Sequence, residues 1–262
     1  MEAEMRGVLR ALAVLRALNL DNGASILKLH QATGISRAAL YRIVGTLHKA
    51  GYLSPDEQTQ SYRLTPLVKH LSEGYDEDAW ITEFAGPLLD RLQAEVIWPT
   101  DLFTFFDDTM IMRRTTRRVS PWTFDRAYIG LRIPLLVTAC GRAYLANLPE
   151  RIVDAVLDRV IGSGDPSLGA AVAPAAMRQL LAKVRNDGYA LREDGFMKET
   201  GSIAVPVLVG GFARCAIAIT YIPSAISSAD AVRKFAPRLQ ECAAELASKL
   251  TGEGPGMGAD GY

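Results

Sequence analysis

The chain has 262 residues, of which 49% are hydrophobic and 22% charged, and its 29 basic and 29 acidic residues cancel. This length allows two domains with hydrophobic cores, and the lack of any run of about 18 apolar residues excludes a membrane-spanning protein. The acids in the N-terminal MEAEMRGVLR, and three widely spaced cysteines without a C-x-x-C pattern, predict a cytoplasmic protein with free thiols and no metal or cofactor.

The zero net charge hides an asymmetry along the chain. Between Arg6 and His70, nine basic residues outnumber three acidic ones, so this segment carries +6 and the remainder carries −6. A basic module joined to an acidic one indicates that the first module meets a polyanion, with chance clustering as the alternative.

Three helices are predicted in the basic module. Apolar residues spaced three and four apart predict a helix over residues 5–20. Ser25 is a suitable N-cap for a short second helix that ends near Thr33. Ser36 is a suitable N-cap for a third helix that ends near Ala50, where Gly51 stops it.

A hairpin and a further helix follow. Residues 52–54 and 61–64 are predicted strands around a polar tip. Thr65 and Pro66 start a fourth helix that runs to about Gly74. These elements predict a winged helix-turn-helix domain over residues 5–64 and a linker helix over residues 65–78.

The acidic remainder alternates between helical and strand-like segments. Helices are predicted around residues 79–95, 138–147, 150–161, 174–187 and 228–250. Strands are predicted over residues 102–106, 109–114, 133–136, 203–209 and 215–221. Because the strands come in hairpin-like pairs, we expect an α/β (α+β) domain over residues 79–251, with a mainly antiparallel sheet flanked by helices. The glycine-rich residues 252–262 are predicted to be a disordered tail.

The predicted third helix has two unlike faces. One is an apolar seam made of Leu40, Ile43, Val44 and Leu47. The other carries small, aromatic and basic residues, and the second helix of a helix-turn-helix enters the major groove, where arginine bonds guanine. The residues predicted to contact DNA are Lys28, Ser36, Arg37, Ala38, Tyr41, Arg42, Lys49 and Arg63. The alternative is an ordinary amphipathic helix with solvated basic residues.

Two acids at the hairpin tip, Asp56 and Glu57, stand where phosphates would repel them. We therefore expect that the tip turns away from the duplex, or that only Tyr62 and Arg63 touch it.

The sequence resembles the IclR family of transcriptional regulators. The resemblance rests on ISRAALYRIVGTLHKAGYL, YRLT, PLLVTACGRAYLA (residues 134–146) and GSIAVPVL (residues 201–208), and it covers residues 5–250. Ala39 departs from the small hydroxyl residue that the family usually has there. The segments LSEGY, WPTDL and RRTT further resemble the branch that regulates hydroxyphenylpropionate catabolism.

The resemblance implies a homodimer, or a dimer of dimers, that binds a double-stranded DNA operator. It also implies a GAF-like C-terminal domain that binds a small organic acid, for which an aromatic acid is the expected effector. The effector-binding residues implied by the family's pattern are Thr138, Ala139, Cys140, Glu193, Ser202, Ala218 and Thr220.

The chemistry of these positions suits such a ligand. Thr138 lies near a predicted helix N-terminus, which favours a carboxylate, and Cys140 suits a small buried filler better than a reactive thiol. Trp98, Phe103, Trp122 and Phe124 are candidates either for the walls of the pocket or for plain core. The basic run RRTTRR (residues 113–118) is expected to be a solvated turn or an intersubunit contact, with anchoring of an anionic effector as the alternative.

An enzyme is disfavoured by what the acidic domain lacks. No histidine follows His70, so a usual general base and metal ligand is missing. No G-x-S-x-G, P-loop or H-E-x-x-H pattern occurs. We therefore expect a ligand-responsive regulator, with an architectural DNA-binding protein and an enzyme with a DNA-binding appendage as the alternatives.

Overall fold

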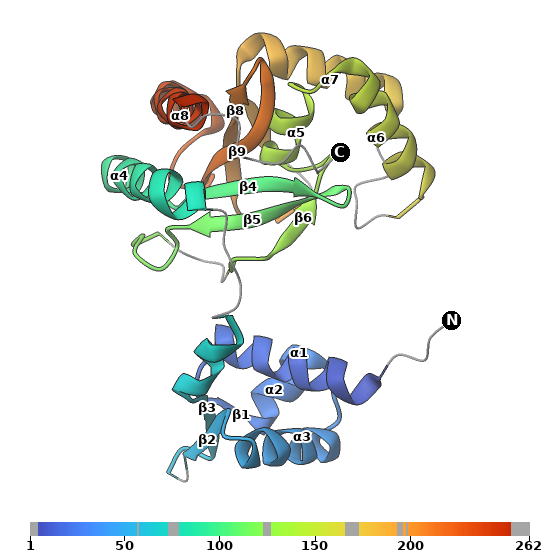
Figure 1. Cartoon of the computed structure of the whole chain (residues 1–262), viewed down its shortest axis with the longest axis vertical. Helices are drawn as coiled ribbons and strands as arrows, with labels where there is room; N and C mark the ends of the chain where they lie inside the picture. The colour runs from blue at the N-terminus through green and yellow to red at the C-terminus, as the bar shows by residue number, and fades with distance from the viewer. Residues whose placement is uncertain are drawn as a thin grey trace. The chain divides into compact units, whose positions relative to one another are not determined.

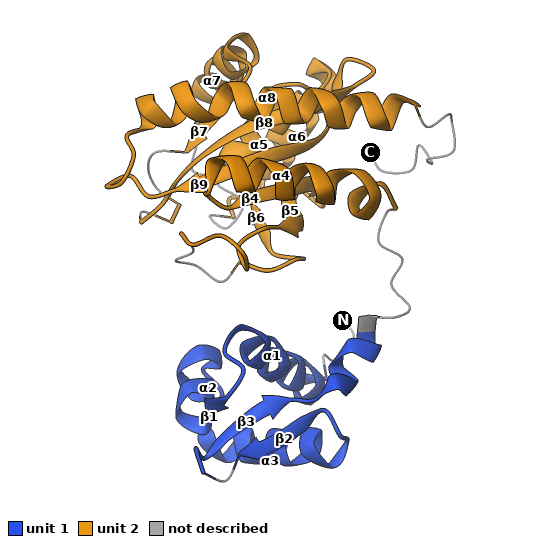
Figure 2. Cartoon of the chain, turned by 90° about the vertical axis from the view of Figure 1, so that its left-hand side faces the viewer, with its two compact units in different colours: residues 1–76 blue, residues 77–262 orange. Residues whose placement is uncertain are grey.

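A computed structural model of the chain describes residues 5–56, 58–72, 79–122, 127–165, 173–192, 196–197 and 199–252. The chain divides into two compact units, residues 1–76 and residues 77–262 (Figure 2). Among the described helices, none combines the length and the apolar character needed to cross a membrane.

The first unit packs three helices against a small sheet (Figure 1). Its elements are α1 (Arg6–Leu20), β1 (Ala24–Ser25), α2 (Ile26–Thr33), α3 (Arg37–Lys49), β2 (Leu53–Asp56), β3 (Ser61–Leu64) and η1 (Pro66–Ser72). The strands pair antiparallel in the order β1-β3-β2. One buried cluster joins the three helices, with Val14 and Leu18 from α1, Leu29 from α2, and Leu40 and Val44 from α3. The predicted winged helix-turn-helix is confirmed.

Two histidines fix the turns at either end of α3. The Nδ1 atom of His30 lies 2.8 Å from the Ile35 carbonyl oxygen, and that of His48 lies 2.9 Å from the Leu53 carbonyl oxygen. Because a carbonyl oxygen only accepts, Nδ1 carries the hydrogen in both rings. These histidines therefore support the fold, together with Gly34, which ends α2 at a φ of 68°.

Some elements of this unit differ from the prediction. The fourth helix begins at Pro66, as the sequence predicts, but it is a 3₁₀ helix that ends at Ser72. Residues 73–78 of the predicted linker helix lie outside the described residues. With two residues, β1 is too short to give a period-two pattern, so the sequence prediction has no counterpart for it.

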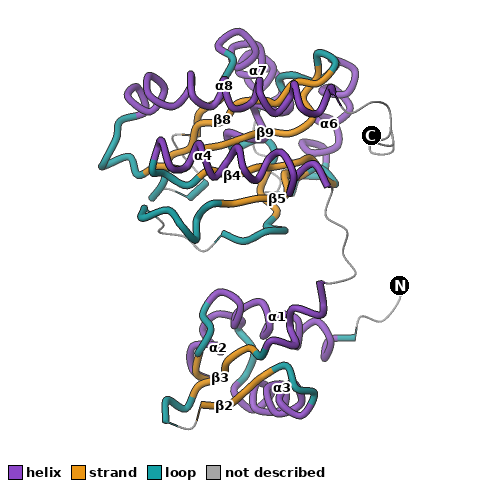
Figure 3. Tube along the Cα trace, turned by 60° about the vertical axis from the view of Figure 1, so that its left-hand side comes forward, coloured by secondary structure: helices purple, strands orange, loops and turns teal. Residues whose placement is uncertain are grey.

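The second unit is built on one six-stranded sheet (Figure 3). Its strands are β4 (Thr100–Phe106), β5 (Thr109–Thr115), β6 (Arg132–Pro134), β7 (Ala190–Arg192), β8 (Gly201–Val209) and β9 (Phe212–Tyr221). Its helices are η2 (Ile81–Ala85), α4 (Gly86–Val96), α5 (Ala139–Leu145), α6 (Glu150–Gly162), α7 (Pro174–Asp187) and α8 (Ser228–Gly252). The strand order is β6-β5-β4-β9-β8-β7, and every described pair is antiparallel, as predicted.

Helices cover both faces of this sheet. On one face, α4 and α8 lie side by side (Figure 2). Helix α8 packs over Ile203, Val205 and Val207 of β8, and α4 packs on β4. On the other face, α5 packs on β8 and β9, with α6 and α7 outside it. The strands present small side chains to α5, among them Ala204 and Ala218, so the helix approaches closely. This face holds the cavity described below.

The second unit also departs from the prediction in detail. The helix predicted from residue 79 contains a π-helical turn, η2, before α4 begins. The three-residue strand β7 is not among the predicted strands, because its pattern is too short. Gly252 of the predicted tail is the last residue of α8, and residues 253–262 lie outside the described residues.

Candidate nucleic-acid interface and effector cavity

The two faces of α3 lie as the sequence predicts. Leu40, Val44 and Leu47 are buried in the core of the unit. On the opposite face, Tyr41 is 60% exposed and Arg42 is also exposed. The remaining predicted contacts on this face, Ser36, Arg37, Ala38 and Lys49, are exposed as well.

Nothing in the described part of α3 neutralises this face, because the helix contains no acidic residue. Ser36 occupies the N-cap position, but its hydroxyl makes no capping hydrogen bond within the described structure, which differs from its predicted role. A hollow beside the start of α3 brings Arg37 and Tyr41 together with Tyr62 of the hairpin. Basic and aromatic side chains thus lie close together where α3 meets the hairpin formed by β2 and β3.

Two of the predicted phosphate contacts have acidic neighbours. The Lys28 ammonium lies 3.0 Å from an Asp21 carboxylate oxygen, and Arg63 Nε lies 3.7 Å from an Asp56 oxygen. Exposed pairs of this kind contribute little to stability, so a phosphate can replace the carboxylate at little cost. Lys28 and Arg63 therefore remain suitable for contacts with the phosphate backbone of DNA.

Asp56 has a structural role at the hairpin tip. One of its oxygens accepts from the N–H groups of Gln58 and Thr59, at 3.1 and 3.3 Å. Hydrogen bonds from Thr59, with smaller contributions from Gln58 and Arg63, lower the pKa of the Asp56 carboxyl below its ordinary value. The tip acid is therefore engaged within the turn. Glu57 lies outside the described residues.

The second unit contains a cavity between α5 and the sheet. The space between its walls is about 450 Å³, part of which is open solvent. Five of the predicted effector residues line it: Thr138, Cys140, Ser202, Ala218 and Thr220. The fold therefore brings together residues that are distant in the sequence: those at the start of α5 and those on the paired strands β8 and β9.

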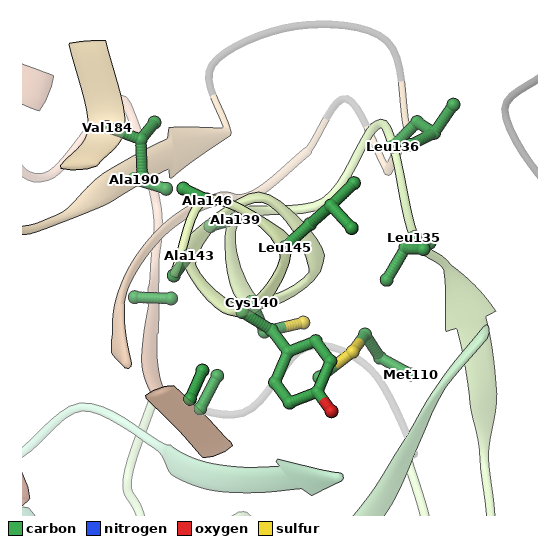
Figure 4. Close-up of a cluster of buried hydrophobic side chains, with 14 of the residues drawn as sticks. Met110, Leu135, Leu136, Ala139, Cys140, Ala143, Leu145, Ala146, Val184 and Ala190 are labelled. Atoms are coloured by element: carbon green, nitrogen blue, oxygen red, sulfur yellow. The ribbon is translucent and has the colours of Figure 1, made fainter. Parts of the chain in front are cut away.

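The predicted residue Ala139 does not line the cavity. It lies with Ala143 and Ala146 on the side of α5 that faces Val184 and Ala190, fully buried in the core (Figure 4). Successive helical residues point about 100° apart, so Ala139 and Cys140 face different directions. The structure therefore places Ala139 in the core and not in the wall of the cavity.

The start of α5 presents a threonine and a thiol to the cavity. Thr138 is the N-cap; its hydroxyl accepts from the Gly141 N–H at 3.3 Å and donates to the Pro134 carbonyl at 2.6 Å. Cys140 is buried, and burial raises the pKa of its thiol to about 12. A neutral thiol at this position supports the interpretation of Cys140 as a filler.

One arginine of the predicted basic run reaches the cavity. Arg117 is 8% exposed and forms a buried ion pair with Asp101, which is 0% exposed; Nη2 lies 2.7 Å from Oδ2. The same nitrogen donates to the Thr220 hydroxyl at 2.9 Å. A solvated turn is therefore wrong for Arg117, although Arg118 is exposed as predicted. A run of basic residues in a sequence predicts a solvated segment, and the burial of Arg117 becomes apparent only from its ion pair with Asp101 on β4.

A second buried arginine, Arg192, is a lining residue that the sequence prediction lacks. It is 4% exposed at the end of β7, and its Nε donates to the Ser202 hydroxyl at 3.3 Å. Its Nη1 donates to the Met197 and Thr200 carbonyls at 2.8 and 2.7 Å. The predicted residue Glu193 follows it directly and lies outside the described residues.

Of the described aromatic candidates for the cavity walls, one lines the cavity and two do not. Phe103 lines the cavity. Trp98 and Trp122 instead stack on each other, with ring centroids 5.4 Å apart, and do not line it. Phe124 lies outside the described residues. The apolar part of the lining comes mainly from aliphatic residues, Met112, Leu131 and Ile133 among them.

A basic winged helix followed by an α/β unit with a cavity of mixed apolar and polar lining defines a class of protein, the DNA-binding regulators that respond to a small molecule. Two family models agree: the IclR helix-turn-helix domain matches residues 7–57, and the bacterial transcriptional regulator IclR C-terminal domain matches residues 75–248. The chain therefore belongs to the IclR family, and it is a DNA-binding transcriptional regulator with a C-terminal effector-binding domain.

Relatives of known role or structure span nearly the whole chain. The Pca regulon regulatory protein of Pseudomonas putida is 25% identical over 253 residues, 95% of this chain and 85% of that protein. The crystal structure of Thermotoga maritima IclR has a TM-score of 0.67 at 17% identity and covers 95% of this chain and 100% of its own. An IclR homologue from Microbacterium hydrocarbonoxydans, complexed with 4-hydroxybenzoate, has a TM-score of 0.64 at 20% identity over 94% and 99% of the two chains. These two structures share the fold.

Proposed function

We propose that this regulator reads its operator with α3 in the major groove and changes its DNA affinity when a small aromatic carboxylic acid binds the cavity. The observation that carries the first part is the exposed Arg42 and Tyr41 on a helix whose other face is buried. An arginine there can bond guanine O6 and N7, while Lys28, Lys49 and Arg63 neutralise phosphates.

The test of the DNA interface is the substitution Arg42→Ala. Duplexes are selected from a random pool by the wild-type chain, and affinities are then measured by gel shift. Loss of a bidentate contact to guanine costs about 1–3 kcal/mol, so we expect roughly 5- to 150-fold weaker binding and relaxed preference at one base pair. Arg10→Ala, an exposed arginine on α1, is the matched control and leaves affinity nearly unchanged. Equal affinity and preference for Arg42→Ala and wild type would refute the assignment.

The chemistry of the cavity and its relatives supports an aromatic acid as the effector. One relative is complexed with 4-hydroxybenzoate and another regulates a Pca regulon. Here the lining combines apolar side chains with hydroxyls and two arginines, which suits a ring that carries a carboxylate. Binding changes DNA affinity only if the acid prefers one conformational state of the chain. An architectural DNA-binding protein has no need of such a cavity.

We also propose that the chain forms a homodimer through the winged-helix unit, with a dimer of dimers as the larger form. Four apolar side chains along α1 are 43–74% exposed: Met5, Val8, Leu9 and Leu12. Leu9→Glu places a charge in this stripe and should give a monomer by sedimentation velocity, because burying an unpaired carboxylate is unfavourable. Leu27→Glu, at an exposed leucine of α2, is the control and should stay dimeric. A Leu9→Glu dimer would exclude this interface.

A further inference from the structure

Two buried arginines donate hydrogen bonds to one cross-strand pair of residues in the sheet. Arg117 donates to Thr220 on β9 at 2.9 Å, and Arg192 donates to Ser202 on β8 at 3.3 Å. Ser202 and Thr220 are direct cross-strand partners. Such partners point to the same face of a sheet, with Cβ atoms roughly 4.5–5.5 Å apart. The two arginines, which are far apart in the sequence, are therefore neighbours in the wall of the cavity.

Each guanidinium is held in a fixed orientation. Asp101 accepts from Arg117 Nη2 at 2.7 Å and from its Nε at 3.3 Å, and the Asp101 carboxylate is itself fixed by the Thr115 hydroxyl at 2.7 Å. Asp101 is not a lining residue, so it supports Arg117 from behind the wall. Arg192 is fixed by the Thr200 carbonyl and hydroxyl, at 2.7 and 2.8 Å.

Two guanidinium groups in one cavity wall suit an anionic ligand, although Asp101 already offsets the charge of Arg117. Planar guanidinium groups also bind carboxylates with paired, charge-assisted hydrogen bonds. The remaining walls close to this position, Phe103 and Ala218 among them, are apolar and suit the body of a ligand.

We propose that Arg117 and Arg192 form a carboxylate cradle that gives the effector site its preference for acids over neutral analogues. This inference rests on the proposed effector function of the cavity. It places the carboxylate above the Ser202–Thr220 pair, whereas the sequence alone suggests the start of α5 near Thr138. Asp101 acts as a positioning residue for Arg117.

The test compares 4-hydroxybenzoate with its neutral, nearly isosteric amide, 4-hydroxybenzamide, by calorimetry on the full chain. The wild type should bind the acid more tightly. In Arg192→Gln, we expect the acid to bind roughly 10- to 100-fold more weakly while the affinity for the amide is unchanged. Arg192→Lys, which keeps the charge, should retain part of the preference.

Arg117 requires a paired change, because its removal alone leaves Asp101 buried without this partner. The double variant Asp101→Asn/Arg117→Gln keeps a neutral hydrogen-bonded pair and should also lose the preference for the acid. Arg178→Gln, at an exposed arginine of α7 outside the lining, is the control and should keep it. Tryptophan fluorescence of each variant verifies folding, and Arg192→Gln decides the matter if the double variant does not fold.

The possible failures are distinguishable. If the wild type binds the amide as tightly as the acid, or if Arg192→Gln keeps the preference, the cradle is overturned while the cavity remains a ligand site. If neither compound binds at millimolar concentration, both the cradle and the aromatic-acid effector are overturned. The DNA-binding assignment is tested independently by gel shift.

Discussion

Gly141 sits where α5 approaches its own preceding loop so closely that a methyl group does not fit. A Cβ atom at this position would lie 1.9 Å from the Leu135 carbonyl oxygen and 2.7 Å from its carbon. These are backbone atoms, so no side chain can rotate away, and the two segments must separate by about 1.5 Å to reach an ordinary contact. Overpacking costs about 1–3 kcal/mol, so Gly141→Ala should destabilise the second unit by roughly 2 kcal/mol.

The chain offers a direct readout and a matched control for this prediction. Its three tryptophans, Trp80, Trp98 and Trp122, all lie in the second unit, so their fluorescence reports on that unit alone. A loss of about 2 kcal/mol lowers the melting temperature by roughly 4–8 °C in a domain of this size. Gly162→Ala in α6 meets no atom within 4 Å and should be neutral or slightly stabilising. Equal melting temperatures for Gly141→Ala and wild type would refute the packing argument.

Two further predictions concern buried ionisable groups. Asp101→Ala leaves Arg117 buried without this carboxylate, so it should lower the free energy of unfolding, measured in urea, by about 3–5 kcal/mol. The double variant Asp101→Asn/Arg117→Gln should recover most of that loss. Similar losses in the two variants would contradict a direct ion pair. Burial raises the pKa of Cys140 to about 12 and that of Cys242 to about 11, from an ordinary 9.0. The unfolded chain therefore loses thiol protons first, so stability should fall as the pH rises from 9.0 towards 11, and Cys140→Ala should fall less steeply; identical pH profiles would contradict this.

The DNA-binding unit could be predicted from the sequence because the patterns that indicate its helices and turns are local. A helical period separates Leu40 and Val44 from Tyr41 and Arg42, and the structure places these side chains on opposite faces. Caps and glycines mark the ends of the helices, as Gly34 does for α2.

The effector site could be predicted only in part from the sequence, because its chemistry depends on contacts between segments that are distant in the chain. Thr138 and Ser202 were found through a family pattern, and both line the cavity. Arg117 and Arg192 carry no local sign of burial, since charged residues are usually solvated. Their positions depend on Asp101 and on the register of β8 with β9, which no local pattern encodes.

The central claim, that α3 reads bases through Arg42, is tested most directly by a coupling measurement. Each guanine of the selected duplex is replaced in turn by 7-deazaguanine, which lacks the N7 acceptor, and affinities are compared for wild type and Arg42→Ala. We expect one guanine in each half of the duplex site where the replacement weakens wild-type binding by roughly 5- to 30-fold and leaves binding by Arg42→Ala unchanged. If the affinities of the two proteins change alike at every guanine, Arg42 does not contact a base and the central claim is contradicted.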